Sequence, residues 1–299
     1  ENDGVHRTSG RIYKITYGHL AKPAVADVSK LTDAQLVEMQ SQPNEWFVRH
    51  ARRVLQERAA DPLIRFREVN VAGTGALARQ AVAAGVRRLV FVSSIKVNGE
   101  QTTTGAPFRE GDSPAPEDPY GQSKLEAEQL LMRIATERAL EVVVVRPPLV
   151  IGAGVGGNLE RLLGTIDRGI PLPLGSIHNR RSLITRDNLA RLLVAAAVVP
   201  AAAGQLFLAA DEPPLSTAEL VRLLARGLGR SPRLVPVPGA LLTTLGALTG
   251  QRAVIHRLTG SLEVDASKAR RLLGWEPAES LTDGVVRCGE AYRARTVRP

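Results

Sequence analysis

Two short runs of consecutive apolar residues stand out in the first half of the chain. Leu89 to Val92 in "RRLVFVSS" and Val142 to Val145 in "EVVVVRPP" are apolar at every position, which is typical of parallel strands covered on both faces. Between them, Leu130, Leu131 and Ile134 recur at helical spacing. Strand, crossover helix and strand together predict a parallel unit of an α/β sheet.

The residues that flank this unit place polar groups at one edge of the predicted sheet. Ser93 and Ser94 directly follow the first strand, at its carboxyl end, which is the edge where open α/β sheets bind their ligands. Asp118 suits the N-cap of the crossover helix, and Pro119 suits its first position. We therefore expect Tyr120 in the first turn of that helix, near the ligand edge.

Tyr120 and Lys124 in "DPYGQSK" are four residues apart and share one face of the predicted helix. An unperturbed tyrosine has a pKa near 10, too high for efficient proton transfer at neutral pH. A neighbouring ammonium stabilises the phenolate, so we expect Lys124 to lower the pKa of Tyr120 and to make it a usable base. Because such a pair also arises by chance, the surrounding motifs decide its meaning.

Beyond the second strand the pattern becomes mostly helical. "GGNLERLLGTIDRGIPLPLG" predicts a helix and an extended proline segment, and "RSLITRDNLARLL" predicts a short strand and a helix. Ser216 and Glu219 form a capping box for a helix from Thr217 to about Leu228. The remainder is rich in predicted helix with proline breaks, which suits a small substrate domain.

Residues 1–60 have a different pattern. "GRIYKITYG" alternates, with Tyr13, Ile15 and Tyr17 on one face, and predicts a strand of an antiparallel sheet. Thr32 and Gln35 form a capping box for a short helix that reaches about Ser41. A second helix is expected from about Pro43. Its inward face would carry Trp46, Phe47, Ala51, Val54 and Leu55, and its outward face Arg49, Arg52, Arg53 and Arg58.

Composition narrows the possible classes of protein. With 299 residues, 44% of them hydrophobic, the chain is long enough for one large α/β domain and a small one. Its single cysteine, Cys288, excludes a disulfide framework and favours a cytoplasmic location. The five histidines are scattered, so we expect no metal site, and no apolar run is long enough for a membrane helix.

The net charge of +9 and the pI near 10.3 raise the question of nucleic-acid binding. Single-strand binding calls for aromatic side chains beside a basic groove, but aromatic residues are only 4% of the chain and the arginines are dispersed. A solvated, arginine-rich surface explains the charge better, and we expect no nucleic-acid partner.

Six motifs occur in order between about Ala60 and about Tyr292: "FREVNVAGT", "VFVSSIKVNGE", "DPYGQSKLEAE", "VVRPPLVIGAGVGGN", "NRRSLITRDNLA" and "SLEVDASKARRLLGWEP". Together they resemble the extended short-chain dehydrogenase/reductase family, in its NAD-dependent epimerase/dehydratase branch, and within that branch proteins similar to UDP-glucose 4-epimerases. Six ordered motifs are far harder to produce by chance than one.

The resemblance implies a role for each residue that matches a family motif. Ser94 would hydrogen-bond the reacting oxygen of a sugar, Tyr120 would be the acid/base, and Lys124 would hold the nicotinamide ribose of NAD. The other implied roles are cofactor lining for Asn70 and Ser93, a place near the nicotinamide for Pro147, pairing with the diphosphate of a UDP-sugar for Arg181, and a weaker substrate contact for Asn158.

The chain also departs from the family pattern. Ile151 stands where family members usually show a tyrosine, a minor change because that position does not transfer protons. The larger departure is at the start, where the family has a Gly-x-x-Gly-x-x-Gly turn whose backbone approaches the cofactor pyrophosphate. Before Gly73 this chain has only Gly4, Gly10 and Gly18, whose spacing fits no such turn.

Residues 1–60 resemble instead the tail of a β-propeller dehydrogenase of the membrane-bound type, running into a HEAT-like helical repeat, through "GRIYKITYG" and "NEWFVRHARRVLQERA". We therefore expect an unrelated fused segment at 1–60, with a divergent cap on an ordinary enzyme as the alternative. The predicted fold class is α/β: a Rossmann-like parallel sheet lacking its N-terminal glycine-rich half, with a small helix-rich substrate domain. The predicted NAD-binding remainder is 61–150 with 181–212, and the substrate domain is 151–180 with 213–299.

The function implied by the resemblance is NAD-dependent epimerisation of a nucleotide sugar, with a homodimer as the expected assembly. Tyr120 would remove the proton of the sugar 4-hydroxyl through or beside Ser94, and NAD would be regenerated in each turnover. A dehydratase or reductase of the same superfamily remains open. A non-catalytic fusion fragment also remains open, because the missing glycine turn predicts that the chain holds NAD poorly.

Overall fold

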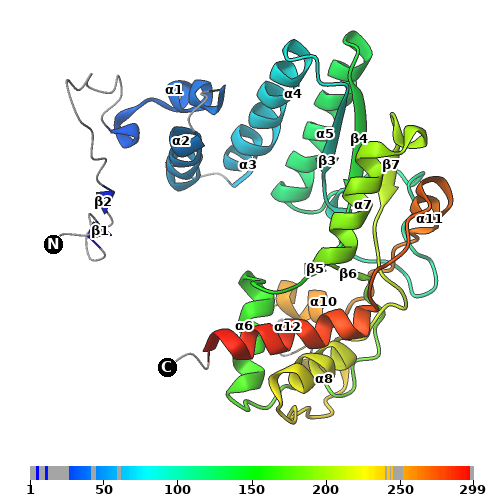
Figure 1. The fold of residues 1–299 in the computed structure, drawn as a ribbon. Coiled ribbons are helices and arrows are strands. Elements are labelled where there is room, and N and C mark those ends of the chain that lie inside the picture. Colours follow the sequence, from blue (N-terminus) through cyan, green and yellow to red (C-terminus); the bar gives the residue numbers. More distant parts are fainter. Residues whose placement is uncertain are drawn as a thin grey trace. The chain divides into compact units, whose positions relative to one another are not determined.

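The computed structural model describes residues 5–6, 11–12, 27–41, 45–58, 62–239, 241–242, 244 and 252–296. The chain divides into two compact units, Glu1–Glu57 and Arg58–Pro299, and each is described by itself (Figure 1). This division lies close to the predicted junction near residue 60, whereas the boundaries predicted further along the chain stay predictions.

The first unit begins with two very short strands. β1 (Val5–His6) pairs antiparallel with β2 (Arg11–Ile12). The other residues of the predicted alternating strand, including Tyr13, Ile15 and Tyr17, lie outside the described residues.

The helices of the first unit form where capping predicts them. Thr32 and Gln35 make the expected capping box at the start of α1 (Asp33–Glu38), between the 3₁₀ turns η1 (Val28–Lys30) and η2 (Met39–Ser41). This box satisfies backbone donors that a helix start leaves free. The helix predicted from about Pro43 is α2 (Glu45–Arg58).

The inward face of α2 differs from the prediction at its first turn. Ala51 and Leu55 are buried as expected, but Trp46 is 46% exposed, and Val48 takes the inward position instead. Val48, Ala51 and Leu55 are spaced at 3 and 4 residues, which places them on one stripe. Trp46 stacks on His50 with ring centroids 4.2 Å apart, so its apolar surface is covered from the same helix rather than by the core.

The second unit contains a parallel sheet of three strands in the order β3-β4-β7 (Figure 1). β3 (Arg88–Val92) and β4 (Glu141–Arg146) are the two predicted apolar strands, and they pair in parallel with Leu89 opposite Val142. β7 (Leu206–Leu208) pairs with the other side of β4. The predicted strand–helix–strand unit is therefore confirmed.

Helices cover both faces of this sheet. α4 (Gly73–Ala83) and α5 (Pro119–Glu137) lie on one face, where Ala78 and Leu131 pack with Val142 and Val144. On the other face α7 (Arg186–Val198) packs through Leu192. Neighbouring side chains of β4 point to opposite faces of the sheet. Because Val142 to Val145 are all buried, both faces of β4 are covered.

β3 is less buried than its sequence predicts. Its side chains are only partly buried, and Val92 is 38% exposed. The reason is its place: among the described residues no strand pairs with the side of β3 that faces away from β4. An open edge at β3 is what the absence of a glycine-turn half from the sequence predicts, so only the expectation that both faces of β3 are fully covered differs from the structure of the described residues.

The remainder of the second unit is a helical layer around a small parallel pair of strands, β5 (Leu149–Ile151) and β6 (Leu183–Thr185). The helices of this layer are α6 (Gly157–Asp167), α8 (Thr217–Leu228), α10 (Arg252–Thr259) and α12 (Leu281–Thr296). α12 runs alongside α8, and α6 and α10 lie next to them (Figure 1). α11 (Ser267–Leu273) packs instead against β7 and α7, beside the three-stranded sheet.

α8 and α12 approach closely through glycines. A Cβ on Gly227 would lie 2.1 Å from the carbonyl oxygen of Val286, and a Cβ on Gly289 would lie 2.5 Å from that of Leu224. Only glycine permits backbones to come this near. The capping box predicted for α8, Ser216 with Glu219, is present, so the start of this helix is set locally and its packing by the two glycines.

Candidate active site at the carboxyl edge of β3 and β4

The ends of β3 and β4 form the edge where the site residues gather. Beyond β3, the Ser93 N–H donates to the Val145 carbonyl at 2.8 Å, and the Ile95 N–H donates to the Pro147 carbonyl at 2.9 Å. Ser94 lies between these two bonds and caps the 3₁₀ turn η4 (Ile95–Val97) by accepting from the Lys96 N–H. Two predicted hydroxyls and Pro147 are therefore brought together at the carboxyl ends of the strands.

Tyr120 lies in the first turn of α5, as predicted. Asp118 is the N-cap, its carboxylate accepts from the Gly121 N–H at 2.7 Å, and Pro119 occupies the first turn. The ring of Tyr120 packs edge-on against Phe66 of α3 (Pro62–Phe66), with centroids 5.5 Å apart. This contact holds the phenol over the start of α5 rather than in open solvent.

Lys124 is on the same helix face but its ammonium points to the edge of the sheet. It donates to the Val92 carbonyl at 3.0 Å and lies 4.8 Å from the centre of the Phe91 ring and 5.9 Å from that of Tyr120. Alternate backbone groups of a parallel strand face opposite neighbours, and the carbonyl of Val92 faces away from β4. Lys124 therefore satisfies an acceptor on the open edge of β3.

The acid–base state of the pair differs from the prediction. Burial raises the pKa of Tyr120, and the negative charge of Asp118 raises it further, against an opposing effect of Lys96. Burial lowers the pKa of Lys124, with an opposing effect of Glu128. The expected lowering of the Tyr120 pKa by Lys124 is thus wrong for the protein without ligands, because the ammonium lies at the sheet edge and the phenol is desolvated.

The residues predicted to hold the nicotinamide end of NAD fit that group. The side-chain oxygen of Ser93 is buried and has no hydrogen-bond partner among the described residues, which is costly unless a ligand supplies one. Asn70 lies in the π-helical turn η3 (Arg67–Ala72) and donates to the Ser123 hydroxyl at 2.9 Å, which in turn donates to the Tyr120 carbonyl at 2.8 Å. The pyrophosphate end does not fit, since the sequence before Gly73 contains no glycine turn.

The two predicted substrate residues lie in the helical layer. The Arg181 guanidinium is largely buried and donates to the carbonyls of Arg257 and Gly260 at 2.7 and 3.1 Å. Burial lowers the pKa of Arg181, and the negative charge of Glu100, in the loop after η4, opposes that shift. Asn158 is exposed at the start of α6, and no contact joins it to the other site residues.

The sequence interpretation missed one charged cluster in this site. The Lys96 ammonium donates to Glu100 at 2.7 Å and to Asp118. Burial alone would lower the pKa of Lys96, but the two carboxylates outweigh it and raise the pKa. Lys96 stands two residues after Ser94 in "SSIKVNGE", and only its four-residue spacing to Glu100 signalled an ion pair.

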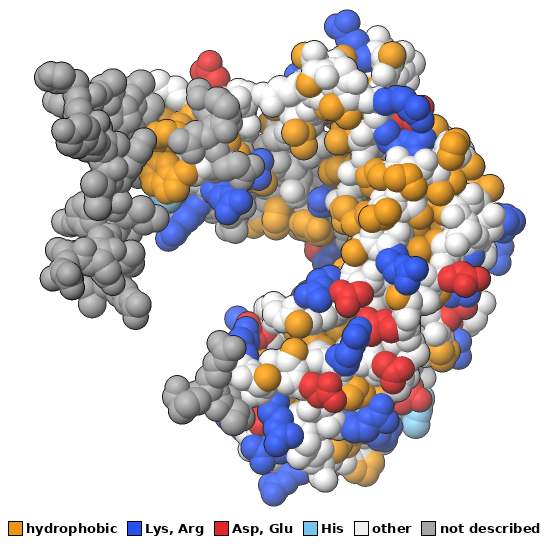
Figure 2. Space-filling model, viewed as in Figure 1, with side chains coloured by type: hydrophobic (Ala, Val, Ile, Leu, Met, Phe, Trp, Pro, Cys, Tyr) orange, Lys and Arg blue, Asp and Glu red, His pale blue; other side chains and the backbone are white. Residues whose placement is uncertain are grey.

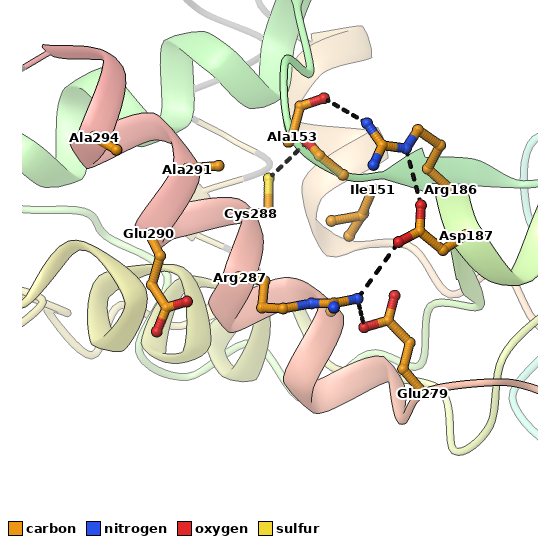
Figure 3. Close-up of a pocket in the computed structure, with 12 residues that line it drawn as sticks. Ile151, Ala153, Arg186, Asp187, Glu279, Arg287, Cys288, Glu290, Ala291 and Ala294 are labelled. Atoms are coloured by element: carbon orange, nitrogen blue, oxygen red, sulfur yellow. Dashed lines mark hydrogen bonds and ion pairs between the residues drawn. The ribbon is translucent and has the colours of Figure 1, made fainter.

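A separate pocket of about 430 Å³ lies between α12 and the loop after β5 (Figure 3). Arg287 on α12 pairs with Asp187 at 3.6 Å and with Glu279, while Arg186 pairs with Asp187 at 3.0 Å. The Cys288 thiol, the only cysteine, donates to the Gly152 carbonyl at 3.3 Å, and burial raises its pKa. Four of the charged side chains that line this pocket pair with one another, and none of the predicted catalytic residues lines it.

Within the described residues, no helix is long and apolar enough to cross a membrane. The same part of the chain holds no group of three or more histidine, cysteine or acidic side chains arranged for a metal ion.

A parallel sheet with hydroxyls at its carboxyl edge, beside a helix that carries a tyrosine and a lysine, is a Rossmann-like arrangement. The model of the NAD-dependent epimerase/dehydratase family matches residues 6–207, and the chain belongs to this family of enzymes. That match includes residues 6–60, nearly all of the N-terminal segment, so the separate origin of residues 1–60 stays a prediction.

Individual relatives agree with the family. The chain is 45% identical to a UDP-glucose 4-epimerase of Vibrio cholerae over 240 residues, 80% of this chain and 73% of that protein. Its fold is similar to the UDP-glucose 4-epimerase of Thermotoga maritima with UDP-glucose, with a TM-score of 0.64 at 20% identity over 90% and 83% of the two chains. The UDP-glucuronic acid 4-epimerase of Bacillus cereus with NAD gives a TM-score of 0.62 at 21% identity over 77% and 68%.

Proposed function

We propose that the carboxyl edge of β3 and β4 is the catalytic site of a nucleotide-sugar 4-epimerase acting on a UDP-sugar, with NAD as its cofactor. The observation that carries the proposal is the convergence of Ser94, Tyr120 and Lys124 at this edge in a chain 45% identical to a UDP-glucose 4-epimerase. When bound, NAD supplies the oxidising and reducing capacity at C4 of the sugar.

Each side chain has a part that follows from its position. Tyr120 takes the proton of the sugar 4-hydroxyl and returns it when the opposite configuration forms. Ser94 holds the reacting oxygen beside the phenol, and Pro147 shapes the wall next to it. In the ligand-free protein the pKa of Tyr120 is raised, so the phenol acts as a base only after its surroundings change, for which release of Lys124 from the Val92 carbonyl is the simplest route.

The cofactor and substrate contacts are assigned by the same reasoning. The unpartnered Ser93 hydroxyl, Asn70 and Lys124 would hold the nicotinamide ribose side of NAD. Arg181 would pair with the substrate diphosphate, a group that suits a guanidinium fork, and Asn158 is a weaker contact. We propose a homodimer and a cytoplasmic location on the family likeness and on the single buried cysteine.

A non-catalytic fragment is the second candidate, because a specific observation favours it. The chain lacks a glycine turn before Gly73, and Lys124 is engaged with the edge of the sheet rather than with Tyr120. In this alternative the site residues are formed but hold no NAD.

The experiment that tests the proposed chemistry uses a chain in which residues 1–60 are exchanged for the glycine-turn half of a related epimerase. We expect this chain to epimerise UDP-glucose and its Tyr120→Phe variant to lose about 10²- to 10⁴-fold in kcat with an unchanged fold, because only the acid/base group is lost. Activity is followed by the appearance of UDP-galactose. Parental turnover by the variant would overturn the role of Tyr120.

A further inference from the structure

The ammonium of Lys96 is held from two sides at the start of α5. It donates to Glu100 at 2.7 Å, in the loop after η4, and to Asp118, the N-cap of α5. Its side chain is 29% exposed, and those of its two partners are 20% and 30% exposed. In a setting this enclosed, ion pairs hold their geometry better than exposed surface pairs do.

The backbone of Lys96 reaches both groups of the proposed chemistry. Its N–H donates to the Ser94 hydroxyl at 3.3 Å. Its carbonyl oxygen would lie 2.8 Å from a Cβ on Gly121, the residue that follows Tyr120. Because glycine lacks that atom, η4 and the first turn of α5 come into direct contact at this point.

The charges around the Tyr120 phenol come from few groups. Lys96 favours its ionised form, whereas Asp118 and burial oppose ionisation. Three other charged side chains described near α5 have partners: Arg67 of η3 pairs with Glu126, Arg146 of β4 pairs with Glu128, and Lys124 donates to the Val92 carbonyl. Among the described residues, Lys96 is the cation bound to the N-cap of α5, two residues before Tyr120.

We propose that Lys96 is a positioning residue for Tyr120 and Ser94, and that its ammonium, clamped by Glu100 and Asp118, supplies the positive charge beside the phenol. The inference deepens the proposed function and rests on it for the catalytic use of the phenol. Lys96 touches neither substrate nor cofactor in this role; it acts through the first turn of α5.

The test is the ionisation of Tyr120 in the full chain, without cofactor or substrate. NMR of tyrosine labelled with carbon-13 at Cζ separates the residue from the other three tyrosines, Tyr13, Tyr17 and Tyr292, and the Tyr120→Phe variant assigns the signal. We expect Lys96→Met to raise the midpoint of Tyr120 ionisation by about one pH unit. Lys96→Arg should restore it, and the matched control Lys30→Met, at an exposed lysine paired with Asp27, should leave it unchanged.

A second variant covers the case in which Lys96→Met does not fold. Glu100→Gln keeps the bond between Lys96 and Asp118 but removes one negative charge from the ammonium, so the Tyr120 midpoint should move downward by a few tenths of a pH unit. A folded Lys96→Met with the parental midpoint, or a Glu100→Gln midpoint that is unchanged or raised, overturns the proposal. The titration needs no turnover, so it is decided separately from the Tyr120→Phe activity test of the proposed function.

Discussion

β3 and β4 lie side by side in one sheet with similar apolar sequences, but their surroundings differ. Val142 to Val145 of β4 are all buried, whereas β3 is half-buried and Val92 is 38% exposed. β4 has a strand on each side; β3 has one only on the β4 side among the described residues. The difference teaches that an apolar strand sequence does not by itself report how many strands flank it among the described residues.

The difference extends to the polar groups at the strands. Lys124 on α5 donates to the Val92 carbonyl on the open side of β3, while the Val144 N–H of β4 donates to the Gln205 carbonyl at 2.9 Å. Figure 2 shows hydrophobic side chains gathered over α7, where Val194 and Val198 are 63% and 67% exposed. Lys124 thus occupies one acceptor on the side of β3 that has no strand partner among the described residues, and exposed edges favour association.

Adding a strand beside the side of β3 that is open among the described residues should have the largest effect. We expect the unaltered chain to purify with little NAD, to self-associate and to be nearly inactive. Exchange of residues 1–60 for a glycine-turn half should give a soluble protein with stoichiometric NAD, because the new strand covers β3 and the turn supplies donors for the pyrophosphate. Gel filtration, NAD release and turnover of UDP-glucose measure the difference.

This prediction is wrong if the unaltered chain is a soluble monomer that retains NAD and epimerises UDP-glucose as fast as the exchanged chain. Residues 1–60 would then bind the dinucleotide by another route, and β3 would have a covering neighbour in solution.

Substitution of one arginine in each strand should have the next largest effect on stability, and the two losses should differ in size. The side chain of Arg146 in β4 is 4% exposed. Its guanidinium donates two hydrogen bonds to the Glu128 carboxylate, one of them 3.0 Å long, and another to the Asn98 side-chain oxygen at 2.9 Å. Arg146→Met should lower the free energy of unfolding by about 3–5 kcal/mol, since a buried carboxylate is left unpaired. Urea unfolding of the second unit measures this loss.

Arg88 of β3 is the matched control. It is also well covered, but its partner Glu141 is 33% exposed and its other contacts are carbonyls at the end of α7, including Val199 at 2.7 Å. Water can replace these bonds, so Arg88→Met should cost about 1–2 kcal/mol. Equal losses for the two arginines would contradict the comparison between β3 and β4.

The smallest expected effect comes from trimming one valine on each strand. Val143→Ala in β4 should cost about 2 kcal/mol, because it removes fully buried methyl groups and leaves a cavity. Val92→Ala at the exposed end of β3 should cost less than about 1 kcal/mol by the same measurement. A loss at Val92 as large as at Val143 would show that β3 is covered in solution.

Much of the second unit could be predicted from sequence because its signals are local. The Asp118 cap with Pro119 placed Tyr120 in the first turn of α5, and the box of Ser216 and Glu219 placed the start of α8. Six motifs in order predicted the family that the family model then showed. The places of Ser93, Ser94 and Tyr120 at or near one edge followed from the direction of the parallel strands and the cap of the crossover helix, whereas the place of Asn70 came from the family resemblance.

The sequence by itself determined helix starts, the buried strand β4, the parallel unit and the family, because each depends on residues close in the chain or on ordered motifs. Tertiary structure alone decided the exposure of Trp46, the contact of Lys124 with Val92 and the clamp on Lys96. These depend on which groups from distant segments compete for the same space and charge. The raised pKa of Tyr120 has this origin too, since burial is a property of the packed fold and not of the spacing between a tyrosine and a lysine.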